Sequence, residues 1–557
     1  MTDTEVLIIG AGPVGLLLAL DLASRGIRVV VAEMRPAGQP PSVKCNHVSS
    51  RTMETLRRLG LSREVRAVGL PHGYPNDIVF RTRMTGTELA RIPIPSRRNR
   101  YQDSSGPDGW WPTPEPPHRV NQIFFEPIFF AHAAQHPNIT LLNETRFDSV
   151  QDEGGSVRAL LTDLPSGASR EIRCRYMVGC DGGSSAVRKQ IGGKLEGDAV
   201  VQRVQSTLID APDLLDALGS GPAWMNYNYN PDRAGTVLAI DGERRWLVHN
   251  YLRPDEETFE EVDRDRCIRR ILGVGPDFPF TQLSNEDWIG RRLVANRFRQ
   301  GRVFIAGDAA HLWVPYAGYG MNAGIADAMD LSWMLAATLQ GWAPEGILDA
   351  YVAERKPITE QVSRFAMGHA SGAIKERNTL PPEIEDDTPE GDAARRAVGA
   401  AAYALNVQQY ACAGLNYGYF YDASPIIAYD GEDAPAYTMH DYTPSTAPGC
   451  RVPHFFLADG RSLYDLCGPG YTLICMEDEG EAPPDVEPLV AAARACGMPL
   501  TVLTVDRALD NVPEVYQHRL LLARPDGHVA WRGDAIDDAA ALVDLLRGAR
   551  MAAEVRP

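Results

Sequence analysis

The first 33 residues alternate between short apolar runs and a turn rich in glycine. Residues 5–9 predict a short buried strand, residues 16–24 have the apolar content of a helix that ends at Gly26, and residues 29–32 predict a second strand. Between the first strand and the helix the sequence reads Gly10-Ala-Gly-Pro-Val-Gly15. A strand, a Gly-x-Gly-x-x-Gly turn, a helix and a second strand in this order predict a Rossmann-type unit that binds a dinucleotide.

The residues of this turn have separate expected roles. Gly10 makes the tight turn, Gly12 lets the backbone approach a pyrophosphate, and Gly15 lets the helix pack closely on the strand. Pro13 and Val14 open the helix, whose free N–H groups and dipole favour the negative charge of the phosphates. The alternative is that the glycines serve packing alone.

Glu33 ends the second predicted strand. A carboxylate at this place binds the ribose hydroxyls of an adenosine and disfavours a 2′-phosphate, so FAD or NAD fits this unit better than NADP. The turn alone does not separate a nicotinamide dehydrogenase from a flavoprotein.

Two later segments repeat the pattern of an apolar strand that ends in a glycine-rich turn. Residues 176–188 contain Asp181 in the turn and Arg188 in the helix that follows, and residues 302–322 contain Asp308 in the turn. A carboxylate at the end of a strand suits the polyol chain of a flavin. The N–H groups of the glycine-rich helix start beyond it would stabilise negative charge on a reduced flavin ring.

With these three motifs in this order, the chain resembles the group A flavoprotein monooxygenases over essentially its whole length. The family includes phenol, hydroxybiphenyl and polyketide hydroxylases. In it, the Gly-x-Gly-x-x-Gly turn holds the FAD diphosphate, the Asp-Gly segment serves FAD and NAD(P)H, and the Gly-Asp segment holds the ribityl chain. The resemblance implies a single-component enzyme in which NADH or NADPH reduces FAD, O2 forms a C4a-hydroperoxide, and a phenolic or polycyclic aromatic substrate is hydroxylated.

The resemblance and the motifs together assign a set of cofactor-binding residues. These are Gly10, Gly12, Pro13, Val14, Gly15, Glu33, Lys44, Gln122, Asp181, Arg188, Gly307, Asp308, Pro315, Gly320, Met321 and Asn322. The helix start at residues 50–54 also resembles a flavin contact. For Arg51 and Glu126, a helix-start charge or a structural ion pair is an equally good interpretation.

The chain departs from the family pattern near residue 45. Lys44 stands where many relatives carry an arginine, and lysine lacks the planar fork of arginine. Asn46 stands where relatives often place the Asp or His that deprotonates the phenol, and an amide cannot act as a base. His47 follows and could take that role, because imidazole titrates near neutral pH. Alternatively, His47 is a loop histidine bonded to backbone, and Asn46 holds the substrate through hydrogen bonds.

Four runs, at residues 201–209, 224–228, 236–240 and 245–251, alternate as half-buried antiparallel strands do. They predict an antiparallel substrate-binding sheet, inserted into the FAD-binding domain at about residues 75–120 and 195–295. Tyr227, Tyr229 and Trp246 either line an aromatic substrate pocket or cover an outer surface of this sheet. The proline-rich segment 106–117 is expected to form a loop over the active site or a surface crossing.

The last part of the chain has a different pattern. A strand at 471–476, a helix at 486–496, a strand at 500–505, a hairpin at 520–531 and a final helix resemble the thioredoxin-like C-terminal domain of the phenol hydroxylase branch. Cys467 and Cys475 are not spaced as a redox pair, so packing or dimer contacts are expected instead of dithiol chemistry. The expected organisation is an α/β FAD-binding domain at 1–395, a connector at 396–448 that follows a Pro- and acid-rich stretch at 378–392, and the thioredoxin-like domain at 449–557.

The composition and charge of the chain restrict the kinds of molecule that it is expected to bind. A length of 557 residues indicates several domains, and a formal net charge of −18 disfavours nucleic acid and anionic lipid. The 9 cysteines contain no Cys-x-x-Cys pair, so neither a metal site nor a disulfide framework is indicated, and a reducing cytoplasmic setting is expected. Charged residues interrupt the apolar stretch at 6–31, so no membrane span is expected. A small aromatic substrate and O2 are the expected partners, and a homodimer is compatible with the sequence.

Two other functions stay open at this stage. One is an FAD-dependent oxidase or dehydrogenase on the same fold, and the other is an FAD-binding protein without turnover. No second Gly-x-Gly-x-x-Gly follows a predicted strand, which argues against a separate nicotinamide domain. NAD(P)H consumption that depends on a substrate, with a product one oxygen heavier, would distinguish the three functions.

Overall fold

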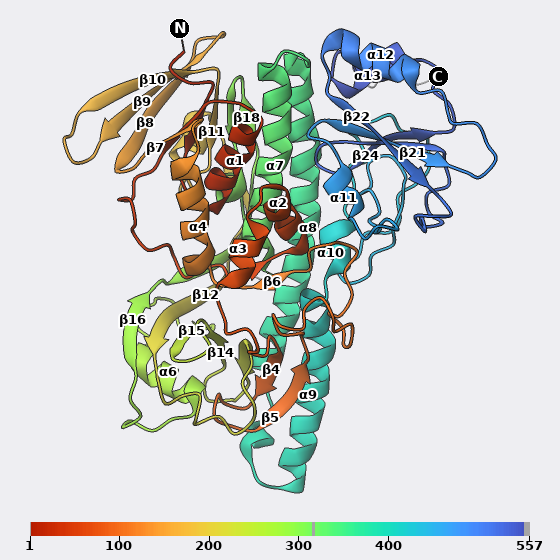
Figure 1. The fold of residues 1–557 in the computed structure, drawn as a ribbon. Helices are drawn as coiled ribbons and strands as arrows, with labels where there is room; N and C mark the ends of the chain where they lie inside the picture. Colours follow the sequence, from red (N-terminus) through yellow and green to blue (C-terminus); the bar gives the residue numbers. More distant parts are fainter. Residues whose placement is uncertain (1, 315–317, 551–557) are drawn as a thin grey trace.

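The computed structural model describes residues 2–314 and 318–550, which form a parallel sheet, an antiparallel sheet and a C-terminal domain beside them (Figure 1). The parallel sheet has the strand order β18-β19-β11-β1-β2-β7, and only the edge strand β18 runs antiparallel to its neighbour. The strands are β1 (Val6–Ile9), β2 (Val29–Ala32), β7 (Ile139–Leu142), β11 (Tyr176–Gly179), β18 (Arg299–Gln300) and β19 (Val303–Ile305). The predicted Rossmann-type fold is confirmed.

Apolar helices pack beside this sheet. Helix α1 (Pro13–Ser24) contacts α4 (Gln122–Gln135) and α7 (Tyr319–Leu339). It is apolar on nearly every side, and Leu16, Leu17 and Leu18 are fully buried, as expected of a helix inside a core. No helix in the described residues combines the length and apolar content that a membrane crossing requires.

Shorter elements surround this core. They are β3 (His47–Val48), α2 (Ser50–Arg58), α3 (Ser62–Ala67), β6 (His118–Arg119), α5 (Ala186–Gln190) and the one-turn helix η1 (Gly307–Ala309). β3 and β6 pair with each other, so His47 lies opposite Arg119. A separate antiparallel sheet stands at one edge and contains β8 (Thr145–Asp152), β9 (Val157–Asp163) and β10 (Ser169–Cys174).

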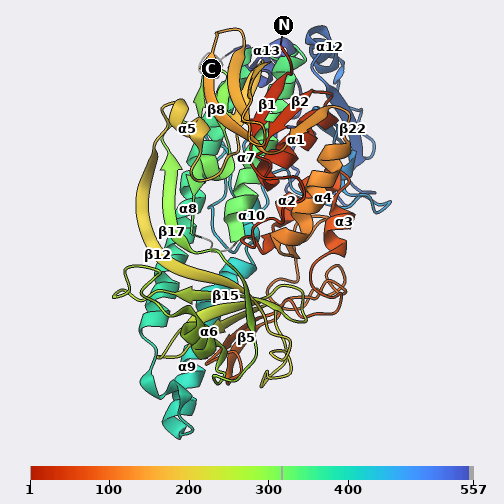
Figure 2. The ribbon, with the colours of Figure 1, turned by 90° about the vertical axis from the view of Figure 1, so that its left-hand side faces the viewer.

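The antiparallel sheet has the order β20-β17-β12-β15-β14-β13-β4-β5, with β16 also paired to β12. Its strands are β4 (Ile78–Arg81), β5 (Glu88–Ile92), β12 (Leu195–Asp210), β13 (Met225–Asn228), β14 (Gly235–Ala239), β15 (Arg245–Tyr251), β16 (Thr281–Asn285), β17 (Trp288–Ala295) and β20 (His311–Leu312). β12 and β17 are long strands of this sheet, and their upper parts lie beside the parallel sheet (Figure 2). Helix α6 (Arg264–Leu272) packs on one face of this sheet, with Ile271 against Gly235.

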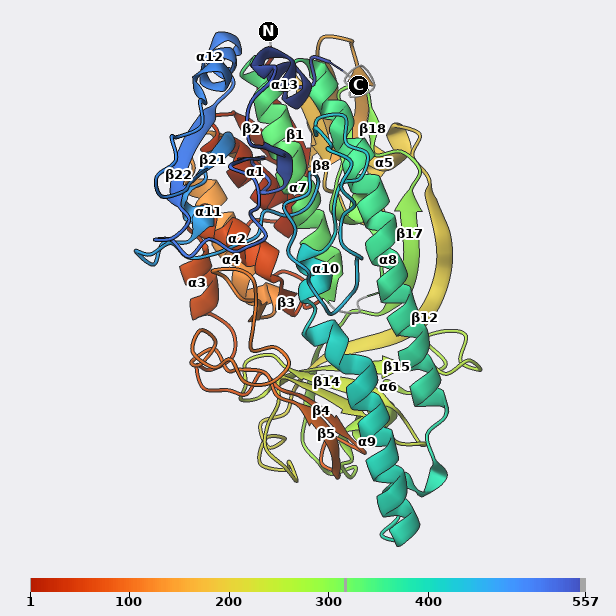
Figure 3. The same cartoon turned by 90° about the vertical axis from the view of Figure 1, so that its right-hand side faces the viewer.

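Two long helices run down one side of the molecule, which faces the viewer in Figure 3. The Pro- and acid-rich stretch at 378–392 contains the short helix η4 (Pro382–Glu385) and joins α8 (Asp349–Asn378) to α9 (Pro389–Tyr410). α9 packs directly on β5, because a Cβ at Gly399 would lie 2.2 Å from the carbonyl oxygen of Leu89. The expected boundary at residue 395 therefore falls within a helix that belongs to the wall of the antiparallel sheet.

The C-terminal domain has the sheet order β22-β21-β23-β24. β21 is parallel to β22 and antiparallel to β23, which is the arrangement of a thioredoxin-like core. Its elements are α11 (Leu463–Leu466), β21 (Tyr471–Glu477), α12 (Glu487–Cys496), β22 (Leu500–Asp506), β23 (Leu520–Ala523), β24 (Val529–Gly533) and α13 (Ala539–Leu546), and α10 (Ala413–Tyr417) precedes the domain. All nine cysteines are free thiols.

A buried ionic cluster joins the C-terminal domain to α7 and α8. The carboxylates of Asp330, Glu354 and Asp526 have oxygens within 4.8 Å of one another. Arg524 donates to both oxygens of Glu354, at 2.6 and 2.7 Å, and to Asp526 at 2.6 Å, while Arg355 lies 3.4 Å from Asp330. Burial and the neighbouring carboxylates raise the pKa of Asp330 to about 7. The position of the C-terminal domain therefore depends on arginine charge inside the interface.

Replacing Arg524 by methionine removes this charge and keeps most of the side-chain volume. Because Glu354 and Asp526 then stay buried without their cation, we expect the free energy of unfolding to fall by about 3–5 kcal/mol, measured by urea unfolding followed by tryptophan fluorescence. Arg461→Met is the control, since it removes an exposed pair with Asp459 and should leave the unfolding midpoint nearly unchanged. Equal midpoints for the two variants would contradict this role of Arg524.

Candidate functional site

A cavity of about 620 Å³ lies between the parallel and the antiparallel sheet. The wall on the side of the parallel sheet includes Gly12, Pro13, Val14, Arg35, Lys44, Gln122, Glu126, Cys180, Gly182, Ala306, Asp308, Gly318, Gly320 and Met321. The wall on the other side includes Ser206, Leu208, Trp224, Met225, Tyr227, Thr236, Leu238, Leu247, His249, Tyr251, Trp288, Gln409 and Tyr410. Asn46, His47 and Arg119 lie among the residues that line the junction.

The glycines of the first turn differ in what surrounds them. A Cβ at Gly10 would lie 2.4 Å from the carbonyl oxygen of Cys180, and one at Gly15 would lie 2.0 Å from that of Gly10, so both glycines serve close backbone packing. A Cβ at Gly12 would meet no atom within 4 Å. Gly12 is also the N-cap of α1, and no side chain caps the helix there. Its open backbone and the free N–H groups fit the phosphates of a dinucleotide.

A second helix begins at the same cavity. Gly318 is the N-cap of α7 with a φ of +60°, a conformation that favours glycine, and no side chain in the described part of the chain caps this helix. Gly320 and Met321, in its first turn, line the cavity. Pro315 lies outside the described residues. Two uncapped helix N-termini therefore provide positive electrostatic potential in one cavity.

Asp308 provides a negative group at this end of the cavity. It lies in η1, directly after β19, and its side chain opens to the cavity. Desolvation raises the pKa of its carboxyl, while the charges of His311 and Lys44 act in the opposite direction. Gly307 before it packs tightly under α7, because a Cβ at Gly324 would lie 2.8 Å from the Cα of Gly307. The carboxylate is suited to accept hydrogen bonds from hydroxyl groups.

Glu33 supports the first turn from inside. Its carboxylate accepts hydrogen bonds from the backbone N–H groups of Ala11 at 2.8 Å and Arg35 at 2.9 Å. Arg35 donates to Glu126 at 3.0 Å, and Gln122 donates to the other oxygen of Glu126. Arg35, Gln122 and Glu126 line the cavity, whereas Glu33 is not among its lining residues. Glu126 therefore forms an ion pair with Arg35 and also lines the cavity, which agrees with both interpretations of this residue.

Asp181 and Arg188 hold the Asp-Gly segment in place. Asp181 accepts from the hydroxyl of Ser185 and from two backbone N–H groups at the start of α5. Arg188 donates to the carbonyl oxygens of Gly183 and Ala309, both at 2.9 Å. Arg188 thus joins the Asp-Gly turn to the Gly-Asp turn. Neither side chain is among those that line the cavity, whereas Cys180 and Gly182 are.

Asn322 connects the start of α7 to β3, the strand that contains His47. Its amide oxygen accepts from the N–H of Ser49 at 2.9 Å and the hydroxyl of Thr52 at 2.8 Å. Its amide nitrogen donates to the carbonyl oxygens of His47 at 3.1 Å and Gly318 at 2.6 Å. The side chain of Asn322 therefore fixes neighbouring protein segments.

His47 is buried and lines the cavity. Its ring packs against Gly318, where a Cβ would lie 3.0 Å from the imidazole. Asn46 also lines the cavity, and its amide oxygen accepts from Asn121 at 2.5 Å. The structure thus brings both candidate catalytic residues to the junction between the two sheets.

One face of the antiparallel sheet forms the floor of the cavity. Ser206, His249, Thr236 and Tyr227 lie side by side across β12, β15, β14 and β13 and form a polar row, and Leu208, Leu247, Leu238 and Met225 form an apolar row next to it. Tyr229 is buried beyond β13 and bonds to Glu376 at 3.2 Å. Trp246 precedes Leu247 on β15 and therefore points to the opposite face, where it is fully buried. Of the three aromatic residues proposed from sequence, Tyr227 alone reaches the cavity.

Some lining residues were not anticipated from the sequence. His249 faces the cavity, and burial lowers its pKa to about 4, so it is neutral at physiological pH. Strand alternation could have placed it opposite Thr236. Arg119 and Tyr410, which lie far apart in sequence, carried no motif.

Two other expected contacts lie elsewhere. The guanidinium of Arg51 lies 4.5 Å above the Tyr419 ring and 3.2 Å from the Nε2 of His528, so it joins α2 to the C-terminal part of the chain. The segment 106–117 is fully described, and none of its residues lines the cavity; Trp111 donates to Asp108 and Trp110 is exposed.

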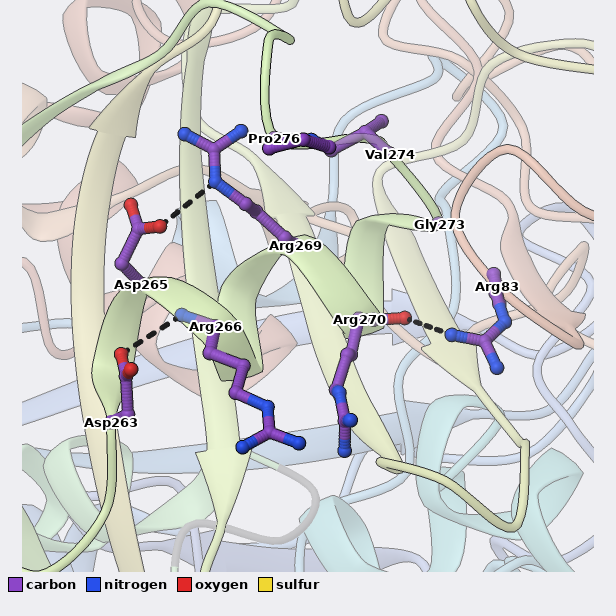
Figure 4. A pocket seen from close by; sticks show the side chains of 9 residues that line it. All are labelled: Arg83, Asp263, Asp265, Arg266, Arg269, Arg270, Gly273, Val274 and Pro276. Atoms are coloured by element: carbon purple, nitrogen blue, oxygen red, sulfur yellow. Dashed lines mark hydrogen bonds and ion pairs between the residues drawn. The ribbon is translucent and has the colours of Figure 1, made fainter.

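A shallower hollow lies over α6, far from these motifs (Figure 4). Three of its four arginines are already paired: Arg269 with Asp265, Arg83 with Glu385, and Arg270 with Asp232. This hollow has the character of a solvated, charge-balanced surface.

Comparison with known proteins adds to this geometry. A family model described as FAD binding domain matches residues 3–366, and one described as aromatic-ring hydroxylase, C-terminal, matches residues 445–549. The chain is 32% identical to aklavinone 12-hydroxylase RdmE of Streptomyces purpurascens, over 98% of each chain. The substrate-free structure of the rebeccamycin biosynthetic enzyme RebC has a TM-score of 0.83 at 33% identity, over 98% of this chain and 99% of that one. The ternary complex of aklavinone-11 hydroxylase with FAD and aklavinone has a TM-score of 0.79 at 29% identity, with the same coverage.

Alanine at Gly12 should affect FAD binding, whereas alanine at Gly15 should affect the stability of the protein. The Cβ of Gly12→Ala projects into open space where a phosphate would lie, so we expect the apoprotein to keep its unfolding midpoint and the purified protein to contain at least about tenfold less FAD. The Cβ of Gly15→Ala meets backbone at 2.0 Å, so the apoprotein itself should unfold earlier. Flavin content by absorbance and thermal unfolding of the apoproteins test both effects. Equal destabilisation by the two variants would remove Gly12 from the phosphate site.

Proposed function

Because the chain belongs to the family of FAD-dependent aromatic-ring hydroxylases, we propose that it transfers one oxygen atom from O2 to a phenolic or polycyclic aromatic substrate, with NADH or NADPH as reductant. One observation carries this proposal. A single cavity contains both the dinucleotide-binding turns and an aromatic-lined face of the antiparallel sheet, so a cofactor and an aromatic molecule fit side by side in one protected space.

The residues that line the cavity on the side of the parallel sheet fit FAD. The open backbone at Gly12 and the N-terminus of α1 would hold the diphosphate, and Asp308 would bind hydroxyls of the ribityl chain. The uncapped start of α7, at Gly320 and Met321, would stabilise negative charge on the ring system. FAD, when bound and reduced by NAD(P)H, supplies the activated oxygen.

The protein would position the aromatic ring and handle its proton. The apolar row of the sheet would hold the ring, and the polar row would bond to its substituents. His47 would accept the proton of the phenolic hydroxyl as oxygen is transferred, because it lies at the junction between the cofactor end and the sheet. Asn46 would hold the same oxygen through its amide. The burial of this junction excludes water, which protects the oxygen transfer from side reactions.

The setting of the enzyme forms a further part of the proposal. Nine free thiols suit a reducing cytoplasmic location. Phe456, Val502 and Leu509 are exposed apolar residues of the C-terminal domain and support contacts between two copies of the chain there.

The proposed reaction is tested with purified, flavin-loaded protein and a panel of phenols, catechols, resorcinols and polycyclic aromatics. We expect at least one ligand to accelerate NADH or NADPH oxidation and to yield a product heavier by one oxygen atom in mass spectrometry, with the label incorporated from ¹⁸O2. Oxidation accompanied only by hydrogen peroxide would favour an oxidase. A protein that binds FAD but consumes no NAD(P)H with any ligand would favour a binding role without turnover.

His47→Gln tests the proton acceptor. The amide keeps a similar size but cannot take a proton, so we expect hydroxylation to slow by about 10²-fold while flavin reduction changes little. The deficit should shrink as the pH rises toward the pKa of the phenol, about 10, because the substrate then ionises by itself. Rapid-reaction measurements of reduction and of product formation across pH separate the two steps. A uniform loss at every pH would assign His47 a structural role.

A further inference from the structure

Arg119 is a buried cation that has no ionic partner among the residues the structure describes. Its side chain lines the cavity with only 4% of the residue exposed. Within the described residues no carboxylate lies within ion-pair distance of it, and its single side-chain hydrogen bond, to the carbonyl oxygen of Tyr410, is long at 3.4 Å. Burial lowers the pKa of Arg119, which reflects the solvation that its charge has lost. A buried guanidinium of this kind is costly unless a bound anion neutralises it.

Aromatic rings hold the guanidinium in place. Its central carbon lies 5.0 Å from the centre of a Trp224 ring and 5.7 Å from that of Tyr410. The hydroxyl of Tyr410 lies 2.7 Å from that of Tyr227, and Gln409 donates to Tyr227 at 3.3 Å. Arg119 therefore lies where the junction meets the antiparallel sheet, near polar groups of the sheet and α9. Cation–π contacts orient the guanidinium but do not neutralise its charge.

The neighbouring carboxylates are already engaged. Asp108, the carboxylate with the largest electrostatic effect on Arg119, accepts from Arg100 and from Trp111, both at 2.8 Å. Glu286, which also lines the cavity, accepts from the hydroxyl of Ser42 and the N–H of Val43. In the hollow over α6, by contrast, Arg269 pairs with Asp265 (Figure 4), and Arg83 and Arg270 pair with Glu385 and Asp232. The charge of Arg119 is therefore available to a ligand in the cavity.

We propose that Arg119 binds an anionic oxygen group of the substrate, so that the enzyme acts on aromatic acids, with a carboxylate as the group that the planar fork fits best. The proposal rests on the proposed hydroxylase function and defines its substrate class. Arg119 lies opposite His47 across the β3–β6 pair, so an acid group held at Arg119 places the attached ring beside the proposed base. The aromatic rings of Trp224 and Tyr410 exclude water from the ion pair and so strengthen it.

The test compares each acid with its methyl ester, which has nearly the same shape but no charge. The pairs are salicylic acid, 3-hydroxy-2-naphthoic acid and anthraquinone-2-carboxylic acid with their esters. Dissociation constants are measured on the flavin-loaded protein from changes in flavin absorbance and tryptophan fluorescence. We expect at least one acid to bind about tenfold more tightly than its ester to the original protein.

Variants of Arg119 then test whether this residue causes the preference for the acid over its ester. We expect Arg119→Met to bind acid and ester within about twofold of each other, and Arg119→Lys, which keeps the charge without the fork, to retain part of the preference. Arg266→Met is the control, because Arg266 lies exposed on α6 outside this cavity, and it should keep the full preference. Flavin content and unfolding midpoint establish that each variant is folded.

Two results would overturn the proposal. One is the absence of an acid preference in all three pairs with the original protein, which needs no variant. The other is a preference that survives in Arg119→Met. Both results are independent of turnover: hydroxylation of neutral phenols without an acid preference would refute this inference alone, whereas Arg119-dependent binding of acids without oxygen incorporation in any assay would refute the proposed function alone.

Discussion

The side-chain amide of Asn322 uses all four of its hydrogen-bonding positions within the protein, and the arrangement of the site depends on them. The four bonds connect the start of α7, the N-cap of α2 and the strand that carries His47. Asn322 leaves the first N–H groups of α7 without a bond to its side chain, and within the described residues no side chain caps them, so they can bind a ligand in the cavity. A helix dipole, a buried histidine and a glycine turn thus meet through one internal side chain.

The sequence allowed the fold to be predicted because its signals are local. The strand–turn–helix unit at residues 5–32 and the alternating strands of the antiparallel sheet both appear within a few residues of one another. The roles of individual site residues are less accessible, because they depend on partners far away in the chain. Asp181 and Arg188 belong to a recognisable motif, yet their side chains cap a helix and bond to Ala309. No local pattern distinguishes such support from direct contact with a ligand.

The antiparallel sheet illustrates a second limit. Alternation correctly identifies β15, but it does not reveal which face of the strand is turned to the cavity, and Trp246 lies on the other face from His249. Arg119 lacks any repeating pattern, and its environment arises only when β6, Trp224 and the end of α9 come together. A side chain in a cavity that can still bind a ligand is therefore identified only from the tertiary structure. The tertiary structure shows whether the side chain is buried and which groups it contacts.

The two ends of the cavity differ in the groups that form them, which are mainly backbone at one end and side chains at the other. At the cofactor end the chain uses backbone groups, tight glycine turns and internal bonds, and a side chain at Gly10, Gly15 or Gly324 would clash with backbone or with Val14. At the other end, single side chains on the rows of the sheet determine shape and polarity, and each can be exchanged while the strand pairing remains. Point mutations can therefore alter which molecule is accepted without endangering inherited cofactor binding. After gene duplication, such a scaffold would let descendant enzymes diverge toward new substrates in single steps.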